Sequence, residues 1–342
     1  MANGEITNSA LVATQAKMGE LLADENSPVN RQYARKKWSL VQALIGEQTI
    51  VPGQIIAQGK DYSVEITWPE LTGLSAVNGV ATCTLGDGTE LGTYKQTYTL
   101  DTGDKLNGPI VVDENDFKSN LYTPEEVRAQ AFLQADAAML DRLQAKALTF
   151  LDANISDSAL NGNGYTSDAD GIWVGDADFN EELIADIEIA AEMNVLGSYF
   201  LITGPKFWRK AKLAGYNSGN AEGKGNIALI NSQNFYFDAR NIAALDNSPI
   251  YQVMSNIYFW AMKNEHTSAV VPITADKVKY TVNSALVPGI TYDVIEERSC
   301  SGGNQTSYKY MFQLRNKLFL HPQSVNASTN KGIIKWLNGT PA

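Results

Sequence analysis

The residues best suited to chemistry in this sequence are four aspartates in one short segment, Asp168, Asp170, Asp176 and Asp178. Carboxylate oxygens are good ligands for Ca²⁺, so such a cluster is a weak candidate for a calcium site. The segment lacks the regular spacing of an EF-hand loop and its closing glutamate. A solvated acidic loop is therefore the favoured interpretation, and we expect no resident metal or cofactor.

Other chemical motifs are incomplete. The stretch GNAEGKG (219–225) has three residues between its glycines where a phosphate-binding loop needs four, and it ends in glycine where Ser or Thr would bind Mg²⁺. GYNSG (215–219) places its serine one position too late for a nucleophile elbow. The two histidines and the two cysteines, Cys83 and Cys300, have no zinc-site spacing. We predict that the chain is not an enzyme and that both cysteines are free thiols.

Composition narrows the class of protein. The chain has 342 residues, of which 44% are hydrophobic and 19% charged, as expected for a globular protein of more than one sub-structure. Its formal net charge of −11 opposes sequence-specific binding to nucleic acid. The sequence contains no apolar run long enough to span a membrane, and its first residues do not resemble a secretory signal. We therefore expect a protein of the cytosol with no membrane partner.

The N-terminal part is predicted to be an arm. Residues 1–27 are small and polar with little to bury, and residues 28–46 have the pattern of one helix, with Pro28 in its first turn. A basic group in this helix is either a solvated face or a contact with a partner subunit or packaged nucleic acid, and the sequence favours neither. It consists of Arg31, Arg35, Lys36 and Lys37, followed by Trp38.

Two segments alternate polar and apolar residues as half-buried strands do, DYSVEITWP (61–69) and TYKQTYTL (93–100). Turn-forming clusters separate and follow them, so residues 50–115 are predicted to form an extended antiparallel ribbon. A two-stranded ribbon is marginal alone and must lie on another surface. Its candidate contact residues are Tyr62, Trp68, Tyr94 and Tyr98.

One helix is predicted to be unusually long. Thr123 is the N-cap residue, Pro124 fits the first helical position, and Glu126 completes a capping box. The pattern continues to Asn154, which gives about 48 Å at 1.5 Å per residue. Its buried stripe includes Phe132, Met139, Leu140, Leu143 and Phe150.

The remaining pattern is mixed, which predicts the α+β class. A loop over 155–180 precedes a helix to about Met193, a buried strand over 197–203, and a polar loop over 215–226. The chain ends in a long hairpin around Gly302-Gly303. Because neither arm nor ribbon can bury its own apolar residues, both are expected to lie across neighbouring copies of the chain. One face of the hairpin carries Tyr308, Tyr310, Phe312 and Leu314.

With these elements in this order, the chain resembles the major capsid proteins of tailed bacteriophages, which share the Hong Kong 97-like fold. The resemblance rests on the second ribbon strand, an acidic junction with Asp113 and Asp116 in VDENDFKSN, and a spine helix with an internal Asp141. NVLGSYFLITGPKFWRKAKLAG is similar to the family's central strand and helix, and NASTNKGIIKWLNG to its closing strand. The order of elements is similar over roughly residues 28–342.

The resemblance implies four parts and a shell-forming role. These would be an N-terminal arm (1–52), an extension loop (53–122), a peripheral domain (123–180 with 291–342) and an axial domain (181–290). The subunit would self-assemble into pentamers and hexamers of an icosahedral head, with scaffolding and portal proteins as partners, around non-specifically held double-stranded DNA. It would reside in the virion capsid and, during assembly, in the host cytoplasm. Some relatives cross-link a ribbon lysine to an asparagine, for which Lys60, Lys95 or Lys105 could serve.

Two alternatives remain open at this stage. An encapsulin-like compartment shares the fold and houses an enzyme as cargo. A calcium-dependent, β-rich binding module would use the acidic loop instead of a shell.

Overall fold

The computed structural model describes most of the elements expected from the sequence. The described residues are 7–33, 38–48, 62–69, 93–113, 123–156, 165–168, 170–174, 182–193, 198–205, 207–209, 235–237, 249–301, 305–321 and 331–339.

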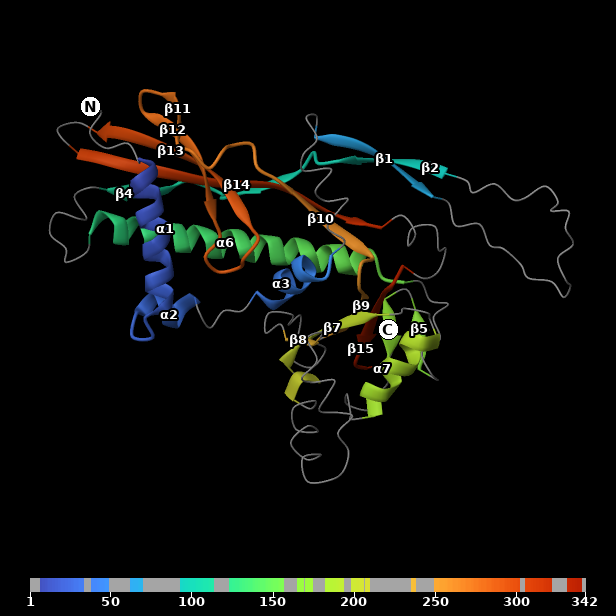
Figure 1. Cartoon of the computed structure of the whole chain (residues 1–342). Coiled ribbons are helices and arrows are strands. Elements are labelled where there is room, and N and C mark those ends of the chain that lie inside the picture. The colour runs from blue at the N-terminus through green and yellow to red at the C-terminus, as the bar shows by residue number, and fades with distance from the viewer. Residues whose placement is uncertain are drawn as a thin grey trace, which may run out of the picture.

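The longest helix, α6 (Pro124–Ala153), confirms the predicted spine helix and runs along the body of the molecule (Figure 1). Its 30 residues span about 45 Å. The backbone N–H of Glu126 donates to Thr123 Oγ1 at 3.3 Å, and the N–H of Thr123 donates to Glu126 Oε2 at 2.9 Å. The capping box therefore forms as its residues predict.

A seven-stranded antiparallel sheet lies along one side of α6. The hairpin of β13 (Thr291–Ser301) and β14 (Gln305–Leu320) forms its centre, as predicted. The outer strands are β10 (Tyr258–Lys263) beside β14, and β12 (Lys277–Asn283) and β11 (Val271–Thr274) beyond β13. Two short strands, β3 (Gly103–Lys105) and β4 (Ile110–Asp113), also pair with β14.

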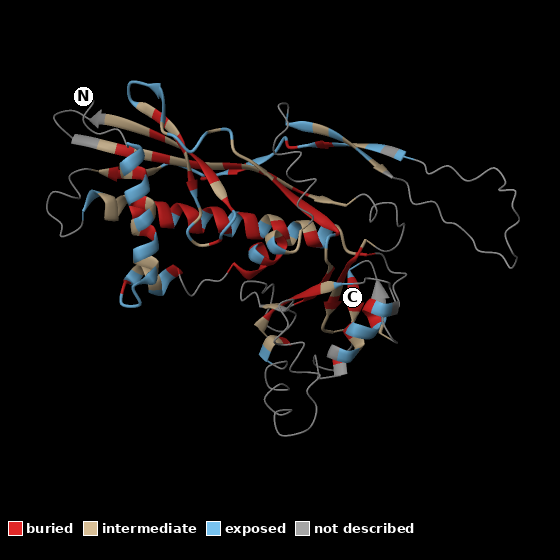
Figure 2. Ribbon diagram, viewed as in Figure 1, coloured by how far each residue is buried: buried red, intermediate tan, exposed pale blue. Residues whose placement is uncertain are grey.

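The apolar stripe of α6 packs on this sheet. Phe132 lies edge-on to both Tyr310 and Phe312, with ring centroids 5.2 Å apart in each pair. Alternate residues of β14 are buried against the helix, as the sequence pattern predicts. Of the predicted stripe, Phe132, Met139, Leu140 and Leu143 are buried and Phe150 is half-buried. Figure 2 shows buried residues in red along most of this helix.

The N-terminal segment corrects two expectations. Residues 8–23 form a helix, α1 (Asn8–Ala23), whose Leu11 and Met18 join the main core, so this segment does bury side chains. The single helix expected over 28–46 is wrong. Two helices occur, α2 (Pro28–Tyr33) and α3 (Ser39–Gly46), and Trp38 between them is not helical, with φ −85° and ψ 59°.

The position of Trp38 explains the break. Its indole is buried, and Nε1 donates to Asp141 Oδ1 of the spine helix at 2.8 Å. α1 and α3 also pack on α6 of the same chain. Part of the arm's apolar surface is therefore covered by its own chain, while Val12 of α1 is 65% exposed, so contact of the arm with neighbouring copies stays a prediction.

A second sheet has six strands in the order β5 (Thr166–Asp168), β6 (Gly171–Trp173), β15 (Ile333–Leu337), β9 (Ile250–Met254), β7 (Tyr199–Thr203) and β8 (Phe235–Phe237). Helix α7 (Glu182–Met193) shares its core. The helix predicted to reach Met193, the strand over 197–203 and the closing strand are confirmed as elements. The loop predicted over 215–226 lies outside the described residues.

The expected domain boundaries do not coincide with these sheets. The boundary at 290/291 separates β12 from β13, which are hydrogen-bonded neighbours. β15 and β9, assigned to different domains by the resemblance, pair in one sheet. The four-part division therefore stays a prediction. Among the described helices, none is both long and apolar enough to cross a membrane.

Candidate functional site

The feature that projects from the body is a two-stranded ribbon, β1 (Ser63–Pro69) with β2 (Thr93–Thr99) (Figure 1). The strands are antiparallel, with Ser63 opposite Thr99 and Trp68 opposite Tyr94. Residues 63, 65 and 67 are exposed and residues 64, 66 and 68 are half-buried, which confirms the predicted alternation. Within the described residues, the two strands pair only with each other.

The base of the ribbon packs on its own chain. Tyr98 and Leu100 are buried beside Phe259 and Ala261 of β10. The Tyr98 ring lies 5.2 Å from the ring of Phe259, centroid to centroid. The expectation that the ribbon must lie on a neighbouring copy is therefore wrong for its base.

Trp68 and Tyr62, two of the other predicted contact residues of the ribbon, also contact their own chain. Trp68 is half-buried and packs edge-on against His321, with centroids 4.6 Å apart. Tyr62 is 36% exposed and contacts residues of β10 and β14. The side chain of Tyr94 lies outside the described residues.

A buried polar cluster joins β3 and β14 of the main sheet to the spine helix α6. The sequence analysis did not predict it. Asp104 of β3 accepts hydrogen bonds from Arg142 Nε and Lys146 Nζ, both at 3.0 Å, and from Asn316 Nδ2 at 2.8 Å. Burial alone would raise the pKa of Asp104, but the hydrogen bonds from Asn316 and Lys146 hold it below its ordinary value. Asn316 also accepts from Trp260 Nε1 at 3.3 Å. The cluster therefore links α6, β3, β10 and β14.

A signal for this cluster was present in the sequence. Asn316 continues the inward-facing series of Tyr308 to Leu314, so a polar side chain occupies a core position. Buried polar groups are almost always hydrogen-bonded, which predicts a partner although not its identity.

A second buried carboxylate, Asp136, lies in the apolar stripe of α6 and is 1% exposed. It accepts hydrogen bonds from Tyr292 Oη at 2.9 Å, from Ser284 Oγ at 2.8 Å, and from the backbone N–H groups of Ala285 and Leu286. Asp136 therefore fastens the middle of the spine helix to the turn between β12 and β13. Burial raises the pKa of Asp136 to about 6, although these hydrogen bonds lower it.

This raised pKa predicts a pH dependence of stability. The folded chain holds the Asp136 proton more tightly than the unfolded chain, so the contribution is fully present below pH 4 and is lost as the pH rises through about 6. The free energy of unfolding should fall by roughly 3 kcal/mol from this group over that window. Urea unfolding of the wild type and of Asp136→Asn at several pH values measures it as a difference. Equal pH slopes in the two proteins between pH 4 and 6 would contradict the prediction.

The candidate calcium site is not assembled by the described residues. Asp170 is exposed, the side chain of Asp168 is outside the described set, and Asp176 and Asp178 lie outside it altogether. Among the side chains that the structure describes, no group of three or more His, Cys, Asp or Glu is placed to hold a metal.

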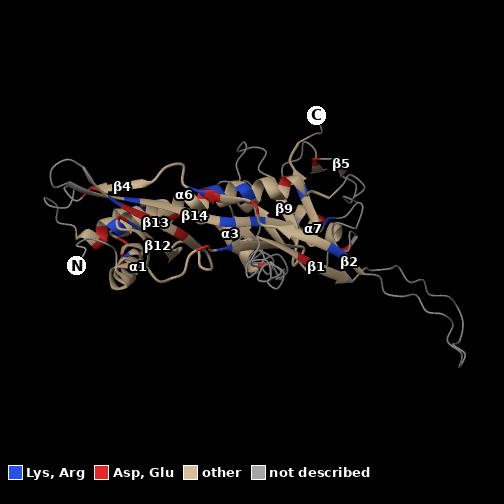
Figure 3. Cartoon of the chain, turned by 90° about the horizontal axis from the view of Figure 1, so that it is seen from above, with Lys and Arg blue, Asp and Glu red and all other residues tan. Residues whose placement is uncertain are grey.

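The basic group is only partly described. Arg31 is exposed on α2, whereas Arg35, Lys36 and Lys37 lie outside the described residues. Figure 3 shows basic and acidic residues interspersed along the described elements. Of the cross-linking candidates, Lys95 pairs with Glu65 at 2.8 Å, Lys105 borders a hollow beside β14, and Lys60 lies outside the described residues.

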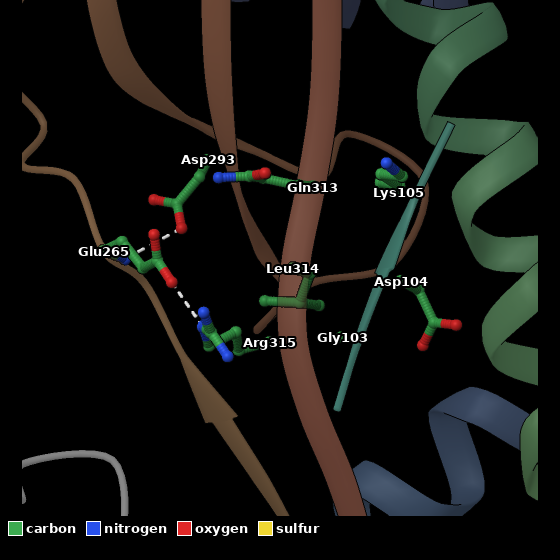
Figure 4. Close-up of a pocket in the computed structure, with 8 residues that line it drawn as sticks. All are labelled: Gly103, Asp104, Lys105, Glu265, Asp293, Gln313, Leu314 and Arg315. Atoms are coloured by element: carbon green, nitrogen blue, oxygen red, sulfur yellow. Dashed lines mark hydrogen bonds and ion pairs between the residues drawn. The ribbon is translucent and has the colours of Figure 1, made fainter. Parts of the chain in front are cut away.

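The hollow has a volume of about 240 Å³ and is lined by residues of β3, β13, β14 and the loop after β10 (Figure 4). Glu265 forms an ion pair with Arg315 across it, and this hydrogen bond holds the pKa of Glu265 below its ordinary value. Asp293 accepts from the backbone N–H groups of Glu265 and His266 at 2.7 and 3.0 Å. The carboxylates of Glu265 and Asp293 therefore hold the loop after β10 against β13 and β14. Its lining residues are Gly103, Asp104, Lys105, Glu265, Asp293, Gln313, Leu314 and Arg315.

Comparisons with known proteins give likenesses in structure only. The sequence matches no protein-family model and no curated protein. A solved structure described as Mycobacterium phage Che8 is similar over 87% of this chain and 90% of its own, with 9% identity and a TM-score of 0.47. The mature capsid asymmetric unit of bacteriophage PhiM1 is similar over 84% of this chain and 85% of its own (11% identity, TM-score 0.43). The capsid asymmetric unit of cyanophage Pam1 is similar over 83% and 86% (10% identity, TM-score 0.44).

Proposed function

We propose that this chain is the major capsid protein of a tailed phage, with a Hong Kong 97-like fold, and that its copies assemble into an icosahedral head around double-stranded DNA. The observation that carries the proposal is the projecting ribbon. Its two strands pair only with each other among the described residues, and the face with Val64, Ile66, Trp68 and Tyr98 packs on the chain's own core. A ribbon of two strands is marginal in water, so its opposite, exposed face, with Ser63, Glu65 and Thr67, is the surface that a neighbouring copy would cover.

The body suits this role. A spine helix of about 45 Å is capped, packed on a seven-stranded sheet and fastened by two buried carboxylates. Such a unit can keep its shape while the ribbon is pulled by neighbouring subunits. The division into arm (1–52), extension loop (53–122), peripheral domain (123–180 with 291–342) and axial domain (181–290) belongs to this proposal.

The electrostatic balance fits an enclosing wall. With a net charge of −11, the subunit repels phosphates overall and would hold packed DNA without sequence preference. Scaffolding and portal proteins are the partners that such a head would need. The subunit would occupy the host cytoplasm during assembly and the virion afterwards, with a structural role and no catalysis.

Electron microscopy of the purified protein, alone and with a co-expressed scaffolding protein, tests the proposal. The wild type should form closed particles. A variant in which residues 70–92 are replaced by Asn-Gly keeps the β1–β2 pairing, because Pro69 and Thr93 are opposite each other, and a two-residue turn can join them. This variant should fold and fail to close shells. A wild type that remains monomeric under all conditions would contradict the proposal.

A further inference from the structure

The connection between β3 and β4 is longer than the stretch of β14 beside which it runs. β3 ends opposite Gln313 of β14, and β4 begins opposite Tyr310. Four residues, 106–109, therefore connect the two strands beside only two residues of β14. The first of the four, Leu106, is buried, and its backbone N–H donates to the carbonyl of Phe312 at 3.1 Å. The extra length thus falls on the other three, which form a bulge at the edge of the sheet.

This bulge is the tripeptide Asn107-Gly108-Pro109, and all three residues are exposed. Proline has no N–H to donate. The N–H of Gly108 has no hydrogen-bond partner among the residues that the structure describes. A Cβ added to Gly108 would meet no atom within 4 Å. The tripeptide is therefore held by β14 at its two ends and surrounded by solvent between them.

An exposed asparagine followed by glycine has a reaction available to it. The backbone nitrogen of Gly108, after losing its proton to hydroxide or a buffer base, can form a bond to Cγ of Asn107. The Cγ–Nδ2 bond then breaks, and Nδ2 leaves as ammonia. Because glycine has no Cβ, nothing on the following residue obstructs closure of the ring. An N–H already bonded in a helix or sheet would first have to break that bond.

We propose that Asn107 is a site of spontaneous deamidation whose only co-substrate is water. Water opens the cyclic succinimide at either of its two carbonyls, which gives aspartate or isoaspartate. Overall, asparagine and water become a carboxylic acid and ammonia. The step involves no change of oxidation state, so it needs neither an oxidant nor a reductant.

The position of the bulge lets the fold accept the product. Isoaspartate adds a carbon atom to the main chain, but residue 107 is not paired with β14, so β3 and β4 keep their register. Among the described strands, β4 pairs only with β14, and Val111 beside the bulge is 57% exposed. A charge on an exposed strand edge opposes pairing with another chain. Deamidation would therefore change how this edge meets other molecules without unfolding the subunit.

The same dipeptide occurs in a different setting at Asn338-Gly339, which provides a control within the molecule. Both residues are half-buried, Gly339 takes part in a β-bridge, and Asn338 has an interaction partner. This asparagine is therefore expected to react more slowly. The remaining Asn-Gly pairs lie outside the described residues and must be followed as separate peptides; they begin at Asn3, Asn78, Asn161 and Asn163.

Peptide mass spectrometry tests the proposal after the folded protein is incubated at mildly alkaline pH in water labelled with heavy oxygen. Asn107 should take up the label about tenfold faster than Asn338, because the segment around Asn338 must first open. In protein unfolded with urea, the two rates should agree within about twofold, since no local structure then separates the sites. Equal rates in the folded protein would overturn the proposal.

Gly108→Ala is the matched variant. Gly108 is not in the left-handed region and has space for a Cβ, so the variant should fold normally. Deamidation of Asn107 should slow about tenfold in it, because the new methyl group hinders ring closure. An isoaspartate-specific methyltransferase with a labelled methyl donor should mark peptide 106–118 of the incubated wild type and leave the variant unmarked. An unchanged rate in Gly108→Ala would overturn the proposal.

The tolerance of the bulge is tested by Asn107→Asp, which carries the charge of one product. It should unfold at the urea midpoint of the wild type, and a lower midpoint would contradict the claim that the fold accepts the product. None of these measurements requires assembled particles. Their outcome therefore stands whether or not the chain forms a shell.

Discussion

Replacement of Leu143 by aspartate is expected to prevent stable folding, and with it any assembly. Leu143 is 0% exposed in the stripe that α6 presents to the core. An aspartate there would bury a carboxylate with no partner provided for it, at a cost of several kcal/mol. A whole domain is stable by only about 5–15 kcal/mol. Urea unfolding and the yield of particles measure the effect.

A neighbouring substitution controls for the helix itself. Ala145 lies two positions along α6 and is exposed, so Ala145→Asp places the same charge in solvent. It should cost only the difference in helix propensity, about 0.7 kcal/mol or less. Normal particles and an unchanged unfolding midpoint in Leu143→Asp would show that the stripe is misassigned.

Removal of the Asp104 carboxylate is expected to have the second largest effect. Asp104→Ala leaves Lys146 without its carboxylate partner and Asn316 Nδ2 without one of its acceptors. Breaking one side of a buried ionic cluster costs about 3–5 kcal/mol. We expect the lower end, about 3 kcal/mol, because Arg142 lies largely in solvent and can be hydrated. The unfolding free energy of purified protein is the measurement.

Asp101 supplies the matched control. It pairs with Lys317 at 3.0 Å, close to Asp104 in the chain, but this pair lies at the surface. Surface ion pairs contribute little, so Asp101→Ala should change stability far less than Asp104→Ala. If both variants shift the unfolding midpoint equally, Asp104 does not act through the buried cluster.

The elements that the sequence predicts best carry their signals locally. The spine helix is marked by Thr123, Pro124 and Glu126 within one turn, and the structure forms the helix from Pro124 to Ala153. The long hairpin follows from two strand-like segments on either side of Gly302-Gly303, the second of which alternates at Tyr308, Tyr310, Phe312 and Leu314. Neither needs knowledge of a distant partner.

The elements that were mispredicted depend on distant partners. α1 fully buries only Leu11, Thr14 and Met18, too sparse a pattern to identify without the spine helix on which it packs. The break at Trp38 follows from its bond to Asp141, 103 positions away in the sequence. Periodicity describes a segment's own faces and carries no information about such pairings.

In the candidate site, too, the features with local signals were predicted and those that depend on distant partners were not. Alternation placed Tyr62, Val64, Ile66 and Trp68 on one face of the ribbon, and that face is confirmed for the last three, whereas Tyr62 lies just before the strand and is exposed. The conclusion that this face must meet another subunit was wrong for the base, because Phe259 and Ala261 of the same chain cover Tyr98. Asp104 and Asp136 are visible in the sequence only as acids with no evident role, and their partners come from β14 and the β12–β13 turn.

The pairing of β14 has a consequence for when the chain can fold during its synthesis. This one strand joins β10, β13, β3 and β4, and its Asn316 bonds to Asp104, 212 positions earlier. Synthesis must therefore pass residue 320 before the main sheet can close. Until then α6 and β3 expose apolar surface, and such long-range closure is slow and prone to aggregation. Any truncation before residue 305 removes the strand with which β3, β4, β10 and β13 pair.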